Sequence, residues 1–224
     1  MEGQLALVEP IGSSPTAAEA RPGLCLTAGA ETRTESGTVC DAVTTTSTST
    51  PRVRLRDVTL DDADLLDAWT RDAHGDRGFN DMSPEPRMVN RDALAKGPLR
   101  DENNGRVIVE RVADGAPVGT VGWHKVRYGP NPESEAWNIG IELVPAMRSR
   151  GYGTEAQRLL ADHLFETTNV NRVEAATDVD NVAEQRALEK AGYRREGIAR
   201  GAQYRAGAYH DLVTYARLRE ESQA

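Results

Sequence analysis

Cysteine is scarce in this chain: its 224 residues include two, Cys25 and Cys40, and both lie in the first fifty. The rest of the chain therefore has no disulfide, no thiol nucleophile and no cysteine metal ligand, which suits a reducing cytoplasm. The four histidines are scattered rather than clustered as metal ligands are. No apolar run approaches the ~18 residues that a membrane span needs. We expect a cytoplasmic protein without a metal site or membrane contact.

Residues 1–50 lack hydrophobic periodicity. They end in a Thr/Ser-rich run at 44–50, preceded by scattered Gly, Ala, Glu and Pro. Such a composition buries too little apolar surface to offset the entropy lost on ordering. We therefore predict a disordered tail over 1–50 and one folded domain over 51–224. The tail does not resemble a secretory leader, because residues 5–8 are too short an apolar core and Glu2 replaces the basic start.

The chain also lacks excess positive charge: its formal net charge is -8. Six acids and two bases lie in the tail, which leaves -4 for the domain. A net negative domain argues against nucleic acid as a partner and favours a cationic substrate such as an amine.

Periodicity and turn signals predict an α+β fold. Strands are expected at residues 53–58, 106–112, 117–127, 134–144, 172–177, 194–202 and 208–219, and helices at 60–73, 86–96, 153–167 and 182–191. These elements make a mixed, mostly antiparallel twisted sheet of about six to seven strands flanked by four helices. Helix 153–167 would be a right-handed crossover between two parallel strands, 134–144 and 172–177.

The most informative segment follows the strand that Pro145 ends, since proline cannot donate to a sheet ladder. A basic turn with Gly151 and Gly153 then leads into an amphipathic helix. Glycines allow close approach of the backbone, and a helix N-terminus offers free N–H groups and partial positive charge. With Arg148 and Arg150 nearby, the turn predicts a pyrophosphate site. It is not a P-loop, because no Gly-Lys-Ser/Thr occurs, and it lacks the third glycine of the dinucleotide fingerprint.

The pattern Arg148-x-x-Gly151-x-Gly153 resembles the acyl-CoA pyrophosphate loop of the GNAT superfamily of N-acetyltransferases. A second run resembles the other GNAT signature in its RimJ/RimL-like form: Asn181-x-x-x-x-Arg186-x-Leu188-Glu189-Lys190-x-Gly192-Tyr193. Asn181 also suits a helix N-cap, and Gly192 a helix C-cap. The resemblance covers residues 52–219.

The resemblance implies a GNAT fold whose central parallel strands splay apart and hold acetyl-CoA as co-substrate. Leu143 and Val144 would contact the pantetheine arm through their backbone, and Asn181 would bind near it. The implied diphosphate site comprises Arg148, Ser149, Arg150, Gly151, Tyr152, Gly153 and Thr154.

Glu142 is the first candidate for the catalytic base. It alternates with Ile141 and Leu143 and therefore faces the other side of the sheet, beside the splay, where a carboxylate can take an amine proton through water. Asp178 and Glu184 are the alternatives. The general acid stays open: Glu184 stands where the RimJ/RimL-like branch usually has Ser, and Leu188 where other members have Tyr.

The acceptor site is predicted around the loop at 75–82 and the last strand. The candidate acceptor residues are Asp76, Phe79, Asn80, Asp81 and His210. The expected activity is acetyl transfer to a primary amine of a small molecule (an antibiotic, polyamine or amino-acid-like compound) or to a protein N-terminus. Two alternatives remain: a non-catalytic acyl-CoA-binding module, and a transferase using another acyl-CoA in antibiotic tailoring or self-resistance. The oligomeric state, a homodimer included, stays open.

Overall fold

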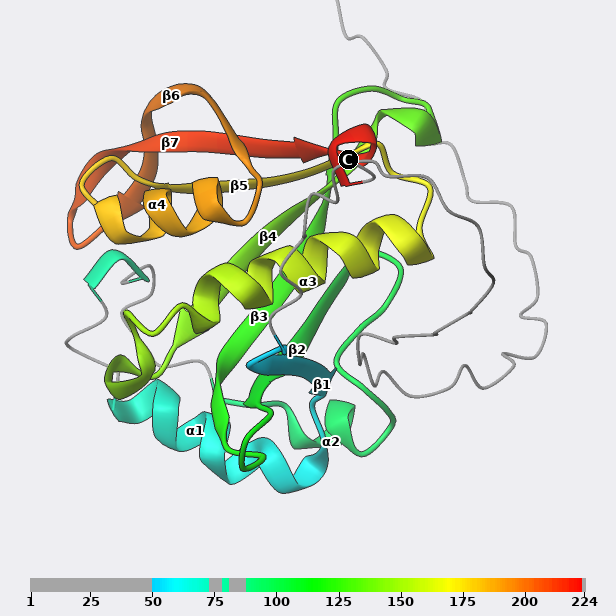
Figure 1. The fold of residues 1–224 in the computed structure, drawn as a ribbon, viewed down its shortest axis with the longest axis vertical. Helices are drawn as coiled ribbons and strands as arrows, with labels where there is room; N and C mark the ends of the chain where they lie inside the picture. The colour runs from blue at the N-terminus through cyan, green and yellow to red at the C-terminus, as the bar shows by residue number, and fades with distance from the viewer. Residues whose placement is uncertain (1–49, 73–77, 81–87, 223–224) are drawn as a thin grey trace, which may run out of the picture.

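A computed structural model describes residues 50–72, 78–80 and 88–222. These residues form one seven-stranded sheet in the order β1-β2-β3-β4-β5-β7-β6 (Figure 1). The strands are β1 (Val53–Asp57), β2 (Asn104–Arg111), β3 (Pro117–Arg127), β4 (Glu135–Leu143), β5 (Arg172–Asp178), β6 (Arg194–Arg205) and β7 (Ala208–Leu218). Only β4 and β5 pair in parallel; the other neighbours are antiparallel. The predicted α+β class with a mixed, mostly antiparallel sheet is confirmed.

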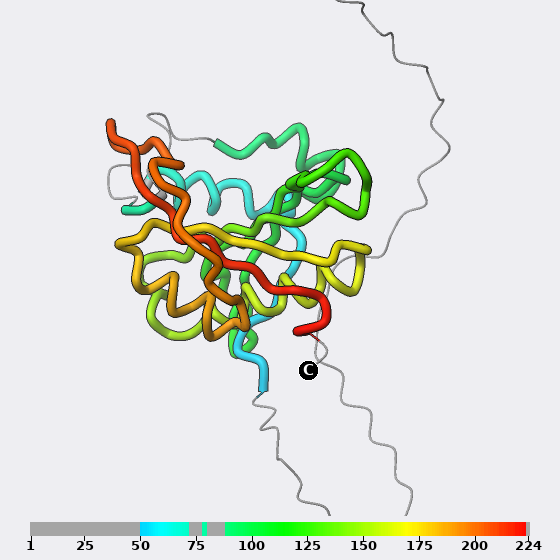
Figure 2. Tube along the Cα trace, turned by 90° about the horizontal axis from the view of Figure 1, so that it is seen from above, coloured from blue at the N-terminus to red at the C-terminus, as the bar shows by residue number. Residues whose placement is uncertain are grey.

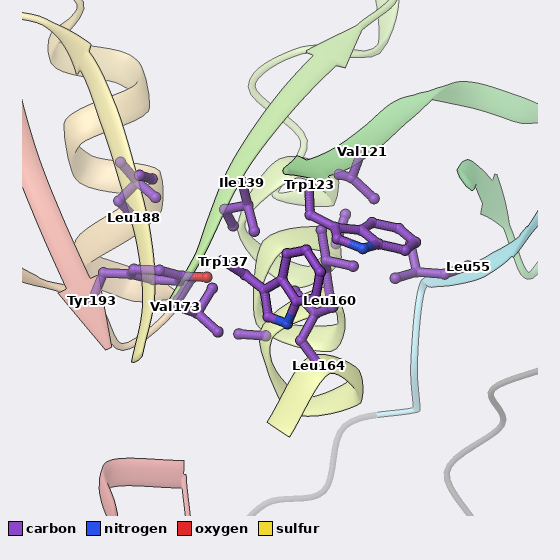
Figure 3. Close-up of a cluster of buried hydrophobic side chains, with 14 of the residues drawn as sticks. Leu55, Val121, Trp123, Trp137, Ile139, Leu160, Leu164, Val173, Leu188 and Tyr193 are labelled. Atoms are coloured by element: carbon purple, nitrogen blue, oxygen red, sulfur yellow. The ribbon is translucent and has the colours of Figure 1, made fainter. Parts of the chain in front are cut away.

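Helices cover both faces of the sheet. They are α1 (Ala63–Asp72), α2 (Arg91–Leu94), α3 (Tyr152–Thr167) and α4 (Val182–Lys190). Figure 2 shows α1 and α4 on opposite sides of the sheet. On the α3 side, alternate strand residues such as Val121, Ile139 and Val173 pack with Leu160 of the helix in the main core (Figure 3). On the other side a smaller core joins Ile108 of β2 to α1 and α2. The period of two along the strands therefore decides which side chains reach which face.

The two parallel strands separate soon after they meet. Their pairing consists of Trp137↔Val173 and Asn138↔Glu174, although β4 continues to Leu143. Beyond Asn138, β5 leaves with β7 and β6 while β4 stays with β3 (Figure 1). The splay that the family resemblance implied is present: beyond Asn138 no described residue of β4 pairs with β5.

Several element boundaries differ from the predictions. The expected helix at 86–96 is much shorter, because the Asn90 side chain accepts a hydrogen bond from the Ala93 N–H and caps α2, which begins at Arg91. The helix expected from residue 60 begins as a 3-10 turn before α1. Strand β6 continues to Arg205 rather than ending at 202. The predicted tail lies outside the described residues apart from its last one.

Candidate active site

The turn between β4 and α3 has the geometry of an anion site. A 3-10 turn at Pro145–Met147 leads into Ser149 (φ 59°) and Gly151 (φ 79°), both in the left-handed region that favours glycine. Gly151 is the N-cap of α3, and no side chain caps this 16-residue helix. The first N–H groups of the helix therefore remain available to an anion, and the helix dipole adds partial positive charge. Tyr152, Gly153 and Thr154 form its first turn.

An arginine from the other end of the domain braces this turn. Arg52, just before β1, donates from Nη1 to the carbonyl of Arg150 at 3.0 Å and from Nε to Glu155 Oε2 at 3.2 Å. Its backbone N–H donates to Glu155 Oε1 at 2.7 Å. The buried Glu155 carboxylate is thereby neutralised in the first turn of α3, where an unpaired acid would repel a phosphate. Sequence reasoning missed Arg52, because nothing local links it to residues about a hundred positions later.

Backbone groups of alternate β4 residues point toward the splay between β4 and β5. Val144 donates its N–H to the Val118 carbonyl of β3, and its own carbonyl accepts from Met147. Both backbone groups of Val144 thus have partners inside the protein, and its contact with the pantetheine arm stays a prediction. Because orientation alternates along a strand, Leu143 and Ile141 point their N–H and C=O toward the splay instead. The Leu143 carbonyl accepts from Arg148 Nε at 3.1 Å. Strand alternation alone would have identified Ile141.

Glu142 lies on the α1 face of the sheet. It lines a cavity of about 120 Å³. The other lining residues are Leu66, Trp69, Thr70, Arg106, Thr120, Leu143, Val144, Pro145 and Arg148. The Glu142 side chain has no hydrogen bond or ion pair with any residue that the structure describes, so it stays free to accept a proton.

A glycine floor extends from this carboxylate. Gly140 is exposed although it lies in a central strand, and it pairs with Gly122 of β3. A Cβ built at Gly140 meets no atom within 4 Å. The α1 face is therefore open where the β4–β5 pairing ends, so an acceptor molecule can approach the splay from this face.

A second cluster joins the end of β5 to the predicted acceptor segment. Arg205 of β6 pairs with the buried Asp178 at the end of β5, and its guanidinium lies 5.3 Å from the Phe79 ring centroid. His210 Nδ1 lies 3.4 Å from Asp178 Oδ2. Burial opposes ionisation of Asp178, yet hydrogen bonds from the Asp180 N–H and Arg205 hold its pKa below the ordinary value. Asp178 is thus a charged but fully engaged carboxylate, less suited to act as a base than Glu142.

Glu184 and Asn181 meet at the start of α4. Asn181 caps the helix: its Oδ1 accepts from the Glu184 N–H at 3.3 Å, and its Nδ2 donates to Thr177. Both ends of its amide therefore have protein partners, which favours the N-cap interpretation. Burial beside α3 raises the pKa of Glu184 to about 7, while a hydrogen bond with Gln157 opposes the shift. Glu184 is thus partly protonated near neutral pH.

The remaining predicted acceptor residues are only partly described. Phe79 and Asn80 belong to a 3-10 turn, Gly78–Asn80. Asp76 and Asp81 lie outside the described residues. Within residues 50–72, 78–80 and 88–222 no group of His, Cys, Asp and Glu has metal-binding geometry. None of the helices in this part of the chain is both long and apolar enough to cross a membrane.

Comparisons with known proteins agree with this architecture. The family model for the acetyltransferase (GNAT) domain matches residues 52–194. The chain therefore belongs to the GNAT acetyltransferase family, whose members are acyl-CoA-dependent N-acetyltransferases. It is similar to the uncharacterized N-acetyltransferase p20 of Bacillus licheniformis, with 26% identity over 177 residues that cover 77% of this chain and 96% of p20.

Solved structures share the fold. Mycobacterium smegmatis RimJ, in complex with CoA-disulfide, has a TM-score of 0.61 at 22% identity, covering 75% of this chain and 83% of RimJ. Spermidine N-acetyltransferase from Vibrio cholerae, in complex with CoA and spermine, has a TM-score of 0.63 at 17% identity, covering 77% of this chain and 99% of that protein. The family prediction, including its likeness to RimJ-type proteins, is confirmed.

Proposed function

We propose that this protein transfers the acetyl group of acetyl-CoA to the primary amine of a small molecule. The observation that carries the proposal is that an anion-binding turn and an unpaired carboxylate lie together at the carboxyl end of β4. The turn has an uncapped helix N-terminus with Arg148 and Arg150, and the α1 face opens at Gly140 beside an unengaged Glu142. An anion-binding turn and a free carboxylate at one strand end are what a CoA-dependent amine transfer requires.

The residues of the turn suit the CoA diphosphate. Free N–H groups of Tyr152, Gly153 and Thr154, with the charges of Arg148 and Arg150, match its negative charge. When bound, acetyl-CoA supplies the activated acyl group as a thioester. The N–H groups of Ile141 and Leu143 point into the splay. Backbone donors in such a position stabilise the negative charge that develops on the thioester carbonyl oxygen.

The carboxylates divide into acid and base roles. Glu142 is exposed and unpaired, so it takes the ammonium proton of the acceptor, directly or through water. Glu184, with a pKa of about 7, retains a proton that it can give to the leaving thiolate, and the second proton that the nitrogen loses on forming the amide passes to solvent. Two carboxyls in such different environments can carry opposite proton-transfer roles at one pH.

A panel of amines tests the proposed function. Purified protein is mixed with acetyl-CoA and aminoglycosides, polyamines, amino acids or short peptides, and products are identified by mass spectrometry. We expect free CoA release together with acetylation of the nitrogen of at least one small amine. CoA binding without transfer to any of them would indicate a non-catalytic acyl-CoA-binding module. Transfer from a different acyl-CoA alone would contradict the acetyl assignment.

Filling the glycine floor should block the acceptor while sparing the cofactor. A leucine at Gly140 projects into open space and suits a strand, so the fold is retained. We expect Gly140→Leu to lower kcat/KM for the amine by roughly 10–100-fold, because the amine is displaced from the reacting geometry. Gly140→Ala is the matched control and should stay near wild type. Equal amine kinetics for Gly140→Leu and wild type would place the acceptor elsewhere.

The raised pKa of Glu184 makes stability depend on pH. Between about 4.5 and about 7 the folded protein keeps a proton that the unfolded chain has released, so this residue's contribution to stability falls as pH rises through that window. Glu184→Gln does not titrate, so its Tm relative to wild type should be higher at pH 8 than at pH 5. A Tm difference that is the same at both pH values would show that Glu184 is not desolvated as described.

A further inference from the structure

Two opposite charges line the cavity beside Glu142 without pairing with each other. Arg106 of β2 and Glu142 of β4 both contribute to the cavity of about 120 Å³. Neither side chain has a hydrogen bond or ion pair with a residue that the structure describes. Other acids on this face of the sheet are engaged: Glu110 pairs with two arginines, and Asp178 with Arg205. Glu142 and Arg106 differ in this respect from Glu110 and Asp178.

The sheet register fixes the spacing of this pair. Arg106 lies opposite Gly122, which lies opposite Gly140, two residues before Glu142. With strands ~4.8 Å apart and a rise of ~3.4 Å per residue, the two Cα atoms are about 12 Å apart. Both side chains are long enough to lean over the glycine floor between them. A gap of this size accommodates a small molecule that carries a positive group toward Glu142 and a negative group toward Arg106.

The cavity walls are largely apolar. Leu66 and Trp69 of α1 line it together with Val144 and Pro145. Apolar walls favour an apolar group on the ligand, because its burial removes hydrocarbon surface from water. Arg148 also lines the cavity, but its Nε is held by the Leu143 carbonyl, and the proposed function assigns it to the diphosphate.

We infer that the acceptor is a small zwitterionic amine: an α-amino acid, or a close analogue, with an apolar side chain. This inference rests on the proposed function and specifies its substrate. The amine of the acceptor meets Glu142, its carboxylate meets Arg106, and its side chain lies against Leu66 and Trp69. A polyamine is disfavoured, because it would bring a second ammonium group toward the unpaired guanidinium of Arg106.

The test compares an amino acid with its own amide. Phenylalanine and phenylalaninamide share the amine and the side chain, but the amide has no carboxylate. Their kcat/KM values are measured for wild type and for Arg106→Gln. We expect Arg106→Gln to lower kcat/KM for phenylalanine by roughly 10–100-fold, the worth of a charge-assisted hydrogen bond, and to leave phenylalaninamide within about threefold. Comparing the two variants on each substrate cancels the different basicities of the two amines.

Two controls separate this effect from general loss of charge or cofactor. Arg127→Gln removes the same charge from an exposed site on the sheet, where Lys125 still pairs with Glu135. This variant should not alter kcat/KM for either substrate. Calorimetry with CoA should give the same affinity for Arg106→Gln and wild type. Equal losses on both substrates, weakened CoA binding, or a wild-type preference for polyamines would each overturn the inference while leaving amine acetylation intact. Absence of transfer to every amine would instead overturn the proposed function, and this inference with it.

Discussion

Glu142→Gln is expected to lower kcat by roughly 10²–10⁴ at neutral pH, the usual contribution of a general base. Glutamine keeps the shape of the side chain but cannot take a proton. Affinity for CoA should hardly change, because the proposed cofactor contacts come from the turn before α3 and from the backbone of β4. The measurement is the rate of CoA release against pH, together with CoA calorimetry.

The pH profile gives the sharper signature of a base. The deficit of Glu142→Gln should shrink at high pH, where the acceptor amine loses its proton without help. Glu133→Gln is a charge-matched control at an exposed turn and should behave like wild type. Turnover of Glu142→Gln within a few-fold of wild type at every pH would move the base elsewhere, with Glu184 the next carboxyl to test.

Gly151→Asp should weaken CoA binding at least roughly tenfold, which corresponds to about 1.4 kcal/mol. Gly151 has φ 79°, and a Cβ there would lie 2.6 Å from Nη2 of Arg52. The substitution therefore strains the backbone, disturbs the brace on the turn and adds a negative charge where phosphates are expected. Calorimetric titration of CoA measures the effect directly.

The matched control for this variant is Gly207→Asp. Gly207 has φ 82° in the turn between β6 and β7, and a Cβ there meets nothing within 4 Å. It carries a similar backbone cost and the same added charge away from the proposed cofactor site. We expect its CoA affinity to match wild type. If Gly151→Asp also kept wild-type affinity, the turn would not be the diphosphate site.

Local signals made the fold and the turn before α3 predictable. Pro145 ends a strand, the left-handed Gly151 begins a helix, and alternation along β4 sets Glu142 apart from its neighbours Ile141 and Leu143. Each signal acts over a few residues, so the sequence carries it directly. The helix expected at 86–96 was predicted too long, because the Asn90 side chain caps α2 and sets its first residue at Arg91.

Partners that meet only in the folded chain could not be predicted in the same way. The brace between Arg52 and Glu155 joins residues about a hundred positions apart, and Arg106 reaches the cavity through strand register rather than sequence spacing. Arg205 likewise joins Asp178 to the segment at Phe79 through the β6–β7 hairpin. Such long-range pairs depend on which strands become neighbours, and a single sequence does not specify that pairing residue by residue.

Calorimetric titration of CoA into three variants tests most directly whether the proposed cofactor turn and the proposed acceptor face are separate sites. Gly151→Asp should bind CoA at least roughly tenfold more weakly than wild type, whereas Glu142→Gln and Gly140→Leu should match wild type. Loss of CoA affinity in Glu142→Gln or Gly140→Leu, or unchanged affinity in Gly151→Asp, would contradict this separation.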